Sequence, residues 1–214
     1  MNFNELKQVF QGEVERIESH LTSFPWEDKH AYAAWCAQTY YYVCHSTRLL
    51  ALSAAHIPLA QDELYNRYLK HIQEETAHEK LALSDLKKLG FKLEDFPALS
   101  VTSSFYQTQY YYIEHVNPFS LLGYILILEG LSAAYGKHCY DRAREAHGSD
   151  KVNFWRVHAE EDPEHVDKAL NCLKNLDEAA LNAIAQNLKD SCSRYGTLLD
   201  TCAALRKGKL RQAA

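Results

Sequence analysis

The chain has 214 residues, of which 47% are hydrophobic and 24% are charged, and its formal net charge is -5. This length fits one domain, residues 1–214, with a core large enough to fold without disulfides. The negative charge disfavours a general nucleic-acid-binding protein, and we expect the basic cluster at 206–211 to be a solvated tail.

Neither a signal peptide nor a membrane span is expected. The N-terminal residues form a charged amphipathic pattern, and Glu129 interrupts the longest apolar run, at 118–130. The six cysteines form no CxxC pair, so we expect buried thiols in a cytoplasmic protein.

Glycine and proline are scarce, and they fall between long segments whose hydrophobic residues recur with the period of an α-helix. Gly90 and Gly148 supply helix ends, and Pro118 supplies a helix start. The predicted helices cover about 4–21, 26–55, 62–89, 103–115, 118–146, 149–175 and 177–205. No segment alternates like a β-strand, so the sequence predicts a single all-α domain of about seven helices.

The first candidate site lies in FWRVHAEEDPEHVDKAL, residues 154–170. His158, Asp162 and His165 are four and three residues apart, so a helix would place them on one face. Imidazole and carboxylate together suit zinc, manganese or non-haem iron. The alternative is a solvated acidic face, which the neighbouring carboxylates fit well. Pro163 removes a backbone hydrogen bond, and it indicates either a new helix start or a helix shaped for function.

The second candidate site is Glu75 with His78, at the three-residue spacing by which helical di-iron carboxylate proteins present ligands. His71 and Glu74 lie near the same helix face. Glu74 also fits the alternative of a solvent-exposed charge near Lys70.

The third candidate is Glu129, whose neighbours in LLGYILILEGLSAAYG are almost all apolar. A buried carboxylate needs a partner, because burying it unpaired is costly and raises its pKa. That partner is either a metal ion or a hydrogen-bonding side chain such as Tyr124 or His45.

Together, these segments offer three carboxylates and three imidazoles on three separate predicted helices. Such a set is a reasonable ligand shell for two metal ions. The candidate ligands are Glu75, His78, Glu129, His158, Asp162 and His165.

The ordered pattern of a carboxylate and histidine, a lone glutamate in GYILILEG and then H-x3-D-x2-H resembles the haem-oxygenase-like di-iron oxidases. The resemblance covers about residues 40–170. It implies the all-helical bundle of haem oxygenase and the thiaminase-type TenA proteins. It also implies two iron ions, or manganese, that use O2 to oxidise a small organic substrate such as an amine, an amino acid or a fatty acid. No haem is expected, and we expect a homodimer without nucleic-acid or membrane partners.

The resemblance carries the metal-ligand role to His78, Glu129, His158, Asp162 and His165. The first carboxylate is predicted to be Glu75, with Glu74 or His71 as alternatives. In the family, the helix that corresponds to residues 149–175 here is often poorly ordered without iron. The resemblance therefore suggests that Pro163 weakens a helix that closes over the second metal.

We also expect Tyr124 and three residues on the predicted helix 26–55, namely Tyr41, His45 and Arg48, to line the same cavity. Two other functions stay open. One is a haem oxygenase with His20 as haem ligand, or a TenA-type hydrolase with Cys139 as nucleophile, although neither explains H-x3-D-x2-H. The other is a non-catalytic metal-binding or protein-interaction module.

Overall fold

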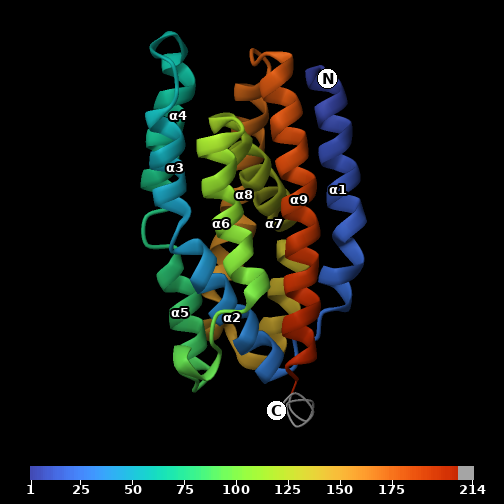
Figure 1. Ribbon diagram of the computed structural model, residues 1–214. Coiled ribbons are helices and arrows are strands. Elements are labelled where there is room, and N and C mark those ends of the chain that lie inside the picture. The colour runs from blue at the N-terminus through green and yellow to red at the C-terminus, as the bar shows by residue number, and fades with distance from the viewer. Residues whose placement is uncertain (207–214) are drawn as a thin grey trace.

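The computed structural model describes residues 1–206, apart from the side chain of Pro163. Most of the basic cluster at 206–211 therefore lies outside the described residues. Long helices run roughly along one axis (Figure 1). The α-helices are α1 (Phe3–Ser23), α2 (Lys29–Val43), α3 (Ser46–Ala55), α4 (Asp62–Glu74), α5 (Glu79–Lys88), α6 (Ser100–His115), α7 (Leu121–His147), α8 (Asn153–Leu173) and α9 (Glu178–Ala204). Short 3-10 helices cover Leu59–Gln61, Leu93–Asp95, Pro118–Ser120 and Ser149–Lys151.

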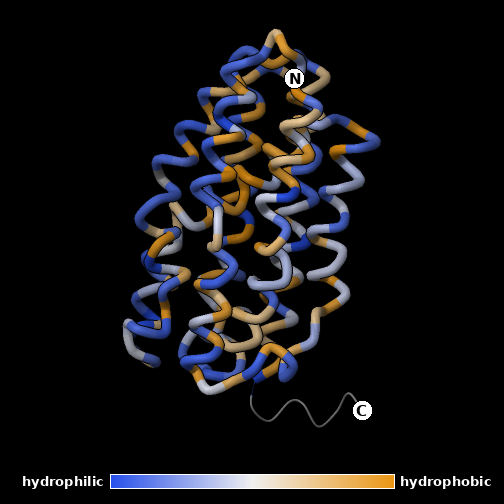
Figure 2. Tube along the Cα trace, turned by 90° about the vertical axis from the view of Figure 1, so that its left-hand side faces the viewer, coloured by the Kyte–Doolittle hydropathy of each residue, from blue (hydrophilic) through white to orange (hydrophobic). Residues whose placement is uncertain are grey.

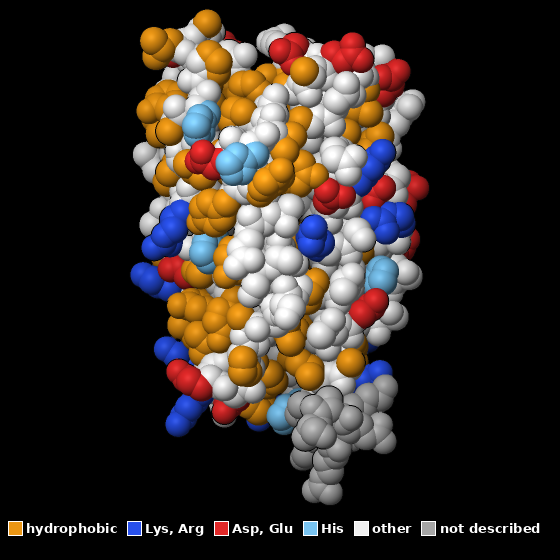
Figure 3. Space-filling model, in the orientation of Figure 1, with side chains coloured by type: hydrophobic (Ala, Val, Ile, Leu, Met, Phe, Trp, Pro, Cys, Tyr) orange, Lys and Arg blue, Asp and Glu red, His pale blue; other side chains and the backbone are white. Residues whose placement is uncertain are grey.

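Helix α7 forms the centre of the bundle and packs against α8, α9 and α1. With the preceding 3-10 turn it is long and apolar enough to cross a membrane, at a mean hydropathy of 1.4, but 78% of that window is buried inside the protein. It is therefore the core helix of the bundle. Figure 2 shows hydrophobic segments running through the inside of the bundle, and in Figure 3 charged side chains of both signs are interspersed on one face.

Two glycines let neighbouring helices approach α7 closely. A Cβ at Gly123 would lie 2.3 Å from the carbonyl oxygen of Ile184 on α9, and a Cβ at Gly130 would lie 2.5 Å from the ring of Phe10 on α1. These distances are far below van der Waals contact. The sequence of α7 therefore fixes how tightly α1 and α9 can pack on it.

Two of the predicted helices are each divided in two. The predicted helix 26–55 breaks at Cys44 and His45, and the predicted helix 62–89 breaks at a turn over residues 75–78. In that turn Ala77 has φ +75°, a backbone conformation that costs a non-glycine residue about 1–2 kcal/mol. Neither break contains a glycine or a proline, and the hydrophobic periodicity continues across both. The sequence therefore gives no local sign of them. We attribute the second break to the tertiary contacts of Glu75 and His78, which are described below.

Candidate metal centre

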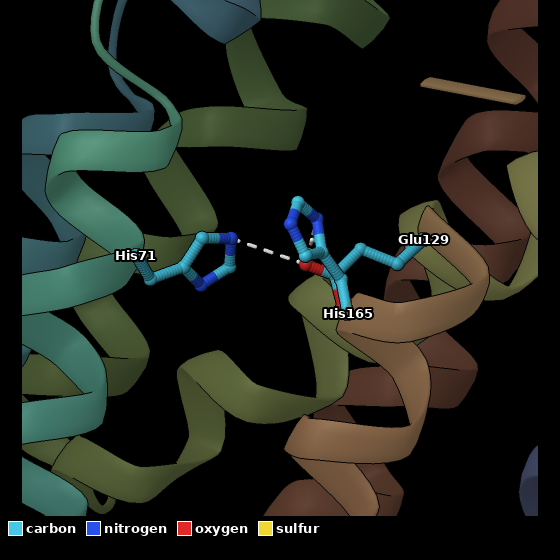
Figure 4. A group of neighbouring side chains, drawn as sticks. All are labelled: His71, Glu129 and His165. Atoms are coloured by element: carbon cyan, nitrogen blue, oxygen red, sulfur yellow. Dashed lines mark ion pairs between the residues drawn. The ribbon is translucent and has the colours of Figure 1, made fainter. Parts of the chain in front are cut away.

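One group of three side chains joins α4, α7 and α8. His71, Glu129 and His165 are all buried, and their candidate ligand atoms lie within 4.8 Å of one another. His71 Nε2 lies 3.1 Å from Glu129 Oε1, and His165 Nδ1 lies 3.8 Å from the same oxygen. The three side chains point toward one another from their separate helices (Figure 4). They offer one carboxylate and two imidazoles to a shared point.

A second group of three lies at the turn between α4 and α5. Glu75, His78 and His158 also bring their candidate ligand atoms within 4.8 Å of one another. His158 Nδ1 lies 2.9 Å from the carbonyl oxygen of Phe154, so this nitrogen donates a hydrogen bond and Nε2 is left with the free lone pair. The backbone of α8 therefore orients this ring before any metal binds.

The Glu75 carboxylate connects the two groups, and the Asp162 carboxylate adjoins the first. Glu75 Oε1 lies 3.5 Å from His71 Nε2, and Asp162 Oδ1 lies 3.4 Å from His165 Nδ1. Asp162 is only 2% exposed. All six predicted ligands thus lie in one continuous cluster, and their role as ligands remains a prediction.

The structure places the alternatives for the first carboxylate, Glu75, Glu74 and His71, differently. His71 is a central member of the cluster, whereas Glu74 lies outside both groups. Glu74 Oε2 instead accepts a hydrogen bond of 2.8 Å from Arg67 Nη1 and lies 3.7 Å from His165 Nε2. The sequence does contain a signal that pairs His71 with Glu75. They are spaced as H-x3-E, and residues four apart meet on one helix face.

Several buried atoms of the cluster lack hydrogen-bond partners of normal geometry within the described residues: Glu129 Oε1, Glu129 Oε2, His165 Nδ1 and His78 Nδ1. Buried polar atoms are normally paired, and an exception needs an explanation. Carboxylate oxygens and imidazole nitrogens that converge on one point suit a divalent transition metal. The residues present therefore fit a metal-binding role.

The electrostatics of the cluster agree with this role. Burial lowers the pKa of His71, but the Glu129 and Glu75 carboxylates more than offset this and raise it to about 9. Burial opposes the ionisation of Glu75, yet contact with His71 and the other imidazoles lowers its pKa to about 2. The anionic cluster therefore stabilises positive charge placed among its side chains.

A cavity adjoins the cluster and is lined by His71, Glu75, Glu129, His158 and Asp162 on that side. Sequence reasoning missed several other lining residues, because they come from five helices: Tyr42, Ser46, Ser132, Trp155 and Tyr195. Trp35 stacks on Trp155 behind this wall, with ring centroids 4.9 Å apart, and Trp26 meets both rings edge-on.

Only one of the four residues predicted to line the cavity does so. Tyr124 lines the cavity, whereas Tyr41, His45 and Arg48 lie outside its lining. Tyr41 donates to the carbonyl of Leu93, His45 stacks on Tyr106 at 3.9 Å, and Arg48 bonds to the carbonyl of Cys44. Their neighbours in the chain line the cavity instead: Tyr42, Val43, Ser46 and Leu49.

The residues suggested for the other two enzyme functions lie elsewhere. His20 Nδ1 is 2.9 Å from Asp200 on α9, and its ring lies against Gly196. Cys139 is fully buried, and burial raises the pKa of its thiol well above the usual value. Neither residue lines the cavity.

The fold is that of known helical proteins. A domain of unknown function with a haem-oxygenase-like fold from Shewanella denitrificans OS217 is similar at a TM-score of 0.80 and 21% identity, over 94% of this chain and 92% of that one. A TenA homologue from Pseudomonas syringae pv. tomato DC3000 is similar at 0.74 and 11% identity, over 92% of each chain. A TenA homologue from P. horikoshii OT3 is similar at 0.70 and 15% identity, over 94% of this chain and 99% of that one.

These likenesses confirm the predicted all-α, haem-oxygenase-like and TenA-like fold. Among curated proteins, none matches the chain. The family described as iron-containing redox enzymes matches residues 33–195, which include every residue of both ligand groups. The chain therefore belongs to the family of iron-containing redox enzymes.

Proposed function

We propose that this protein is an O2-dependent oxidoreductase that holds two iron ions. His71, Glu129 and His165 would hold one ion, and Glu75, His78 and His158 would hold the other. Asp162 adds a third carboxylate beside His165. The observation that carries the proposal is the presence of two groups of three candidate nitrogen and oxygen ligands in one largely buried cluster.

Bound iron would supply the electrons that reduce O2 and so drive the oxidation of an organic substrate. The protein side chains prepare the site for this chemistry. The carbonyl of Phe154 fixes the ring of His158, and the apolar cavity wall excludes water from the cluster. The site also keeps its carboxylates inside the bundle, where their attraction for cations is strong.

The test is anaerobic titration with Fe(II), followed by addition of O2. We expect about two iron ions per chain and rapid O2 consumption after loading. His158→Ala and His165→Ala should each lower the iron content to about one ion per chain, because each removes a ligand from a different group. Glu160→Gln, on the exposed face of the same helix, is the matched control and should change nothing.

Two outcomes would contradict the proposal. One is an iron content that neither histidine substitution changes. The other is iron that loads fully but never consumes O2, which would leave only a metal-binding function. Stoichiometric binding of haem with a Soret band would instead support a haem oxygenase.

A further inference from the structure

All three tryptophans of the chain lie in one group. Trp26 precedes α2, Trp35 lies on α2 and Trp155 lies on α8, and each ring meets the other two. The ring centroids are 4.9 Å apart for Trp35 and Trp155, 5.3 Å for Trp26 and Trp155, and 5.4 Å for Trp26 and Trp35. All three side chains are buried. We call this group the tryptophan triad.

The inner end of the triad lies at the candidate metal centre. Trp155 lines the same cavity as His158 and Asp162. The ring of Phe154 stacks on the ring of His158 at 4.0 Å and meets Trp35 edge-on at 5.6 Å. Electrons pass quickly between aromatic groups in contact, because their electronic coupling falls steeply as the gap between them widens. The triad is therefore placed to exchange electrons with a metal ion bound by His158.

The outer end of the triad lies just beneath the protein surface. Trp26 belongs to the connection between α1 and α2, and the next residue, Glu27, is exposed. The carbonyl oxygen of Trp26 accepts a hydrogen bond of 2.8 Å from Nε2 of His147, whose side chain is half-buried. A thin layer of protein therefore separates Trp26 from molecules in solution, whereas Trp155 faces the interior cavity.

The hydrogen bonds of the indole N–H groups give the triad a direction. Trp26 donates to the carbonyl of Leu21 at 2.8 Å, and Trp35 donates to the hydroxyl of Tyr195 at 3.3 Å. Within the described residues, Nε1 of Trp155 has no partner. An oxidised indole carries positive charge, and a close acceptor at its N–H stabilises that charge. The charge should therefore move outward from Trp155 to Trp26, and each indole keeps its proton because no strong base accepts it.

We propose that the triad supplies electrons when O2 reacts without an organic substrate, and so protects the site from oxidation. This inference rests on the proposed function. Reduction of O2 to two water molecules takes four electrons and four protons, and two bound Fe(II) ions would supply two of the electrons. The triad supplies the other two, one at a time, and the protons come from solvent. A one-electron reductant in solution, such as ascorbate, then reduces the triad at Trp26 and is itself oxidised to its radical. Without the triad, oxidation would fall on cavity residues such as His71 and Tyr124.

The first test looks for the oxidised triad directly. Protein loaded with Fe(II) is mixed with O2 in the absence of an organic substrate, frozen and examined by electron paramagnetic resonance. We expect a tryptophan radical whose lines narrow when the protein contains ring-deuterated tryptophan, and which ascorbate removes. Trp155→Phe should lose this signal, whereas Trp35→Phe should keep it, because Trp26 meets Trp155 directly. Tyr140→Phe, on α7 and away from the cavity lining, is the control and should change nothing.

The second test maps where oxidation damage falls. After repeated additions of O2 without a reductant, peptide mass spectrometry should find added oxygen mainly at Trp26, and ascorbate should prevent it. In Trp155→Phe the damage should move to His71 and Tyr124. Trp26→Phe, which lies away from the cavity lining, should still form the radical but lose it more slowly to ascorbate. A triad that only packs the core gives no tryptophan radical and the same damage map in every variant, and that result would overturn the inference.

A metal-free experiment separates this inference from the proposed function. A ruthenium tris-bipyridine photo-oxidant in solution, excited by a flash with persulfate as electron acceptor, should produce the tryptophan radical in metal-free protein and less of it in Trp26→Phe. That result in a protein that binds no iron would refute the proposed function and support the triad as an electron path. Protein that holds about two iron ions and consumes O2, but forms no tryptophan radical in either experiment, would support the proposed function and overturn the inference.

Discussion

The carboxylate of Asp85 accepts a hydrogen bond of 2.9 Å from the backbone N–H of Phe154, and a second of 2.8 Å from the side chain of Asn153. Asp85 lies on α5 and is fully buried, whereas Phe154 lies in the first turn of α8. The residue before α8, Val152, has no side chain that could cap the helix. A residue of α5, far away in the chain but adjacent in space, therefore caps α8, the helix that carries His158.

Removal of this cap should loosen the ligand-bearing helix. We expect Asp85→Ala to lower the free energy of unfolding by about 1–2 kcal/mol or more, because it leaves a buried N–H without a partner. Denaturant unfolding measures the loss, and hydrogen exchange should show faster exchange at the start of α8. Asp85→Asn keeps one acceptor oxygen and should lose less. Equal losses in both variants would contradict the capping role.

Glu74 should act on the metal site through His165 rather than as a ligand. Its carboxylate is held by Arg67 and faces His165 Nε2, the nitrogen opposite the one directed at Glu129. We expect Glu74→Gln to weaken binding of one metal ion about tenfold without changing the number of ions bound, because outer carboxylates orient ligating histidines. Metal titration measures this.

A matched control for that prediction is Glu160→Gln, which removes an exposed carboxylate from α8. It should leave both metal affinities unchanged. Loss of one whole metal equivalent in Glu74→Gln would instead identify Glu74 as a direct ligand.

The free energy of unfolding of the metal-free protein should depend on pH through the ionisation of His71. Its pKa is raised to about 9 in the fold and is about 6.5 in an unfolded chain, so the folded state binds the proton more tightly. The resulting stabilisation, about 3 kcal/mol, is complete below about pH 6.5 and is lost as the pH rises to about 9. His71→Ala should flatten this part of the stability profile. An unchanged slope in that variant would show that another group is responsible.

The same pKa predicts how metal binding responds to pH. A metal ion must displace the proton of His71 at neutral pH, so metal affinity should rise as the pH increases toward about 9. Calorimetry in buffers of different ionisation enthalpy should detect a released proton. Binding without proton release at pH 7 would contradict this.

Gly123 should be intolerant of even one added carbon. A Cβ there would lie 2.3 Å from the carbonyl oxygen of Ile184 and 2.6 Å from the backbone nitrogen of Leu188. Because these are backbone atoms, the helices must move apart, and we expect Gly123→Ala to cost about 2 kcal/mol or more. Gly12→Ala meets nothing within 4 Å and should stabilise α1 by up to about 1 kcal/mol. Thermal unfolding of the pair tests this, and a Gly123→Ala protein as stable as the original would contradict it.

The sequence by itself determined the all-α class and the chemical types of the candidate ligands, because both depend on local patterns. Helical periodicity is repeated every few residues, and the spacing of His158, Asp162 and His165 puts them on one helix face whatever surrounds it. The apolar neighbours of Glu129 likewise predicted its burial, which the structure has.

Only the tertiary structure decided how these side chains are grouped. Residues on different helices meet according to packing, which no local pattern encodes, so His71 rather than Glu74 faces Glu129. The turn at 75–78 interrupts a segment whose local pattern is helical, and there Ala77 has a positive φ while Glu75 and His78 lie beside His158 of α8. Asp85 caps α8 across a separation of 69 residues for the same reason: its partner is a neighbour in space and not in the chain.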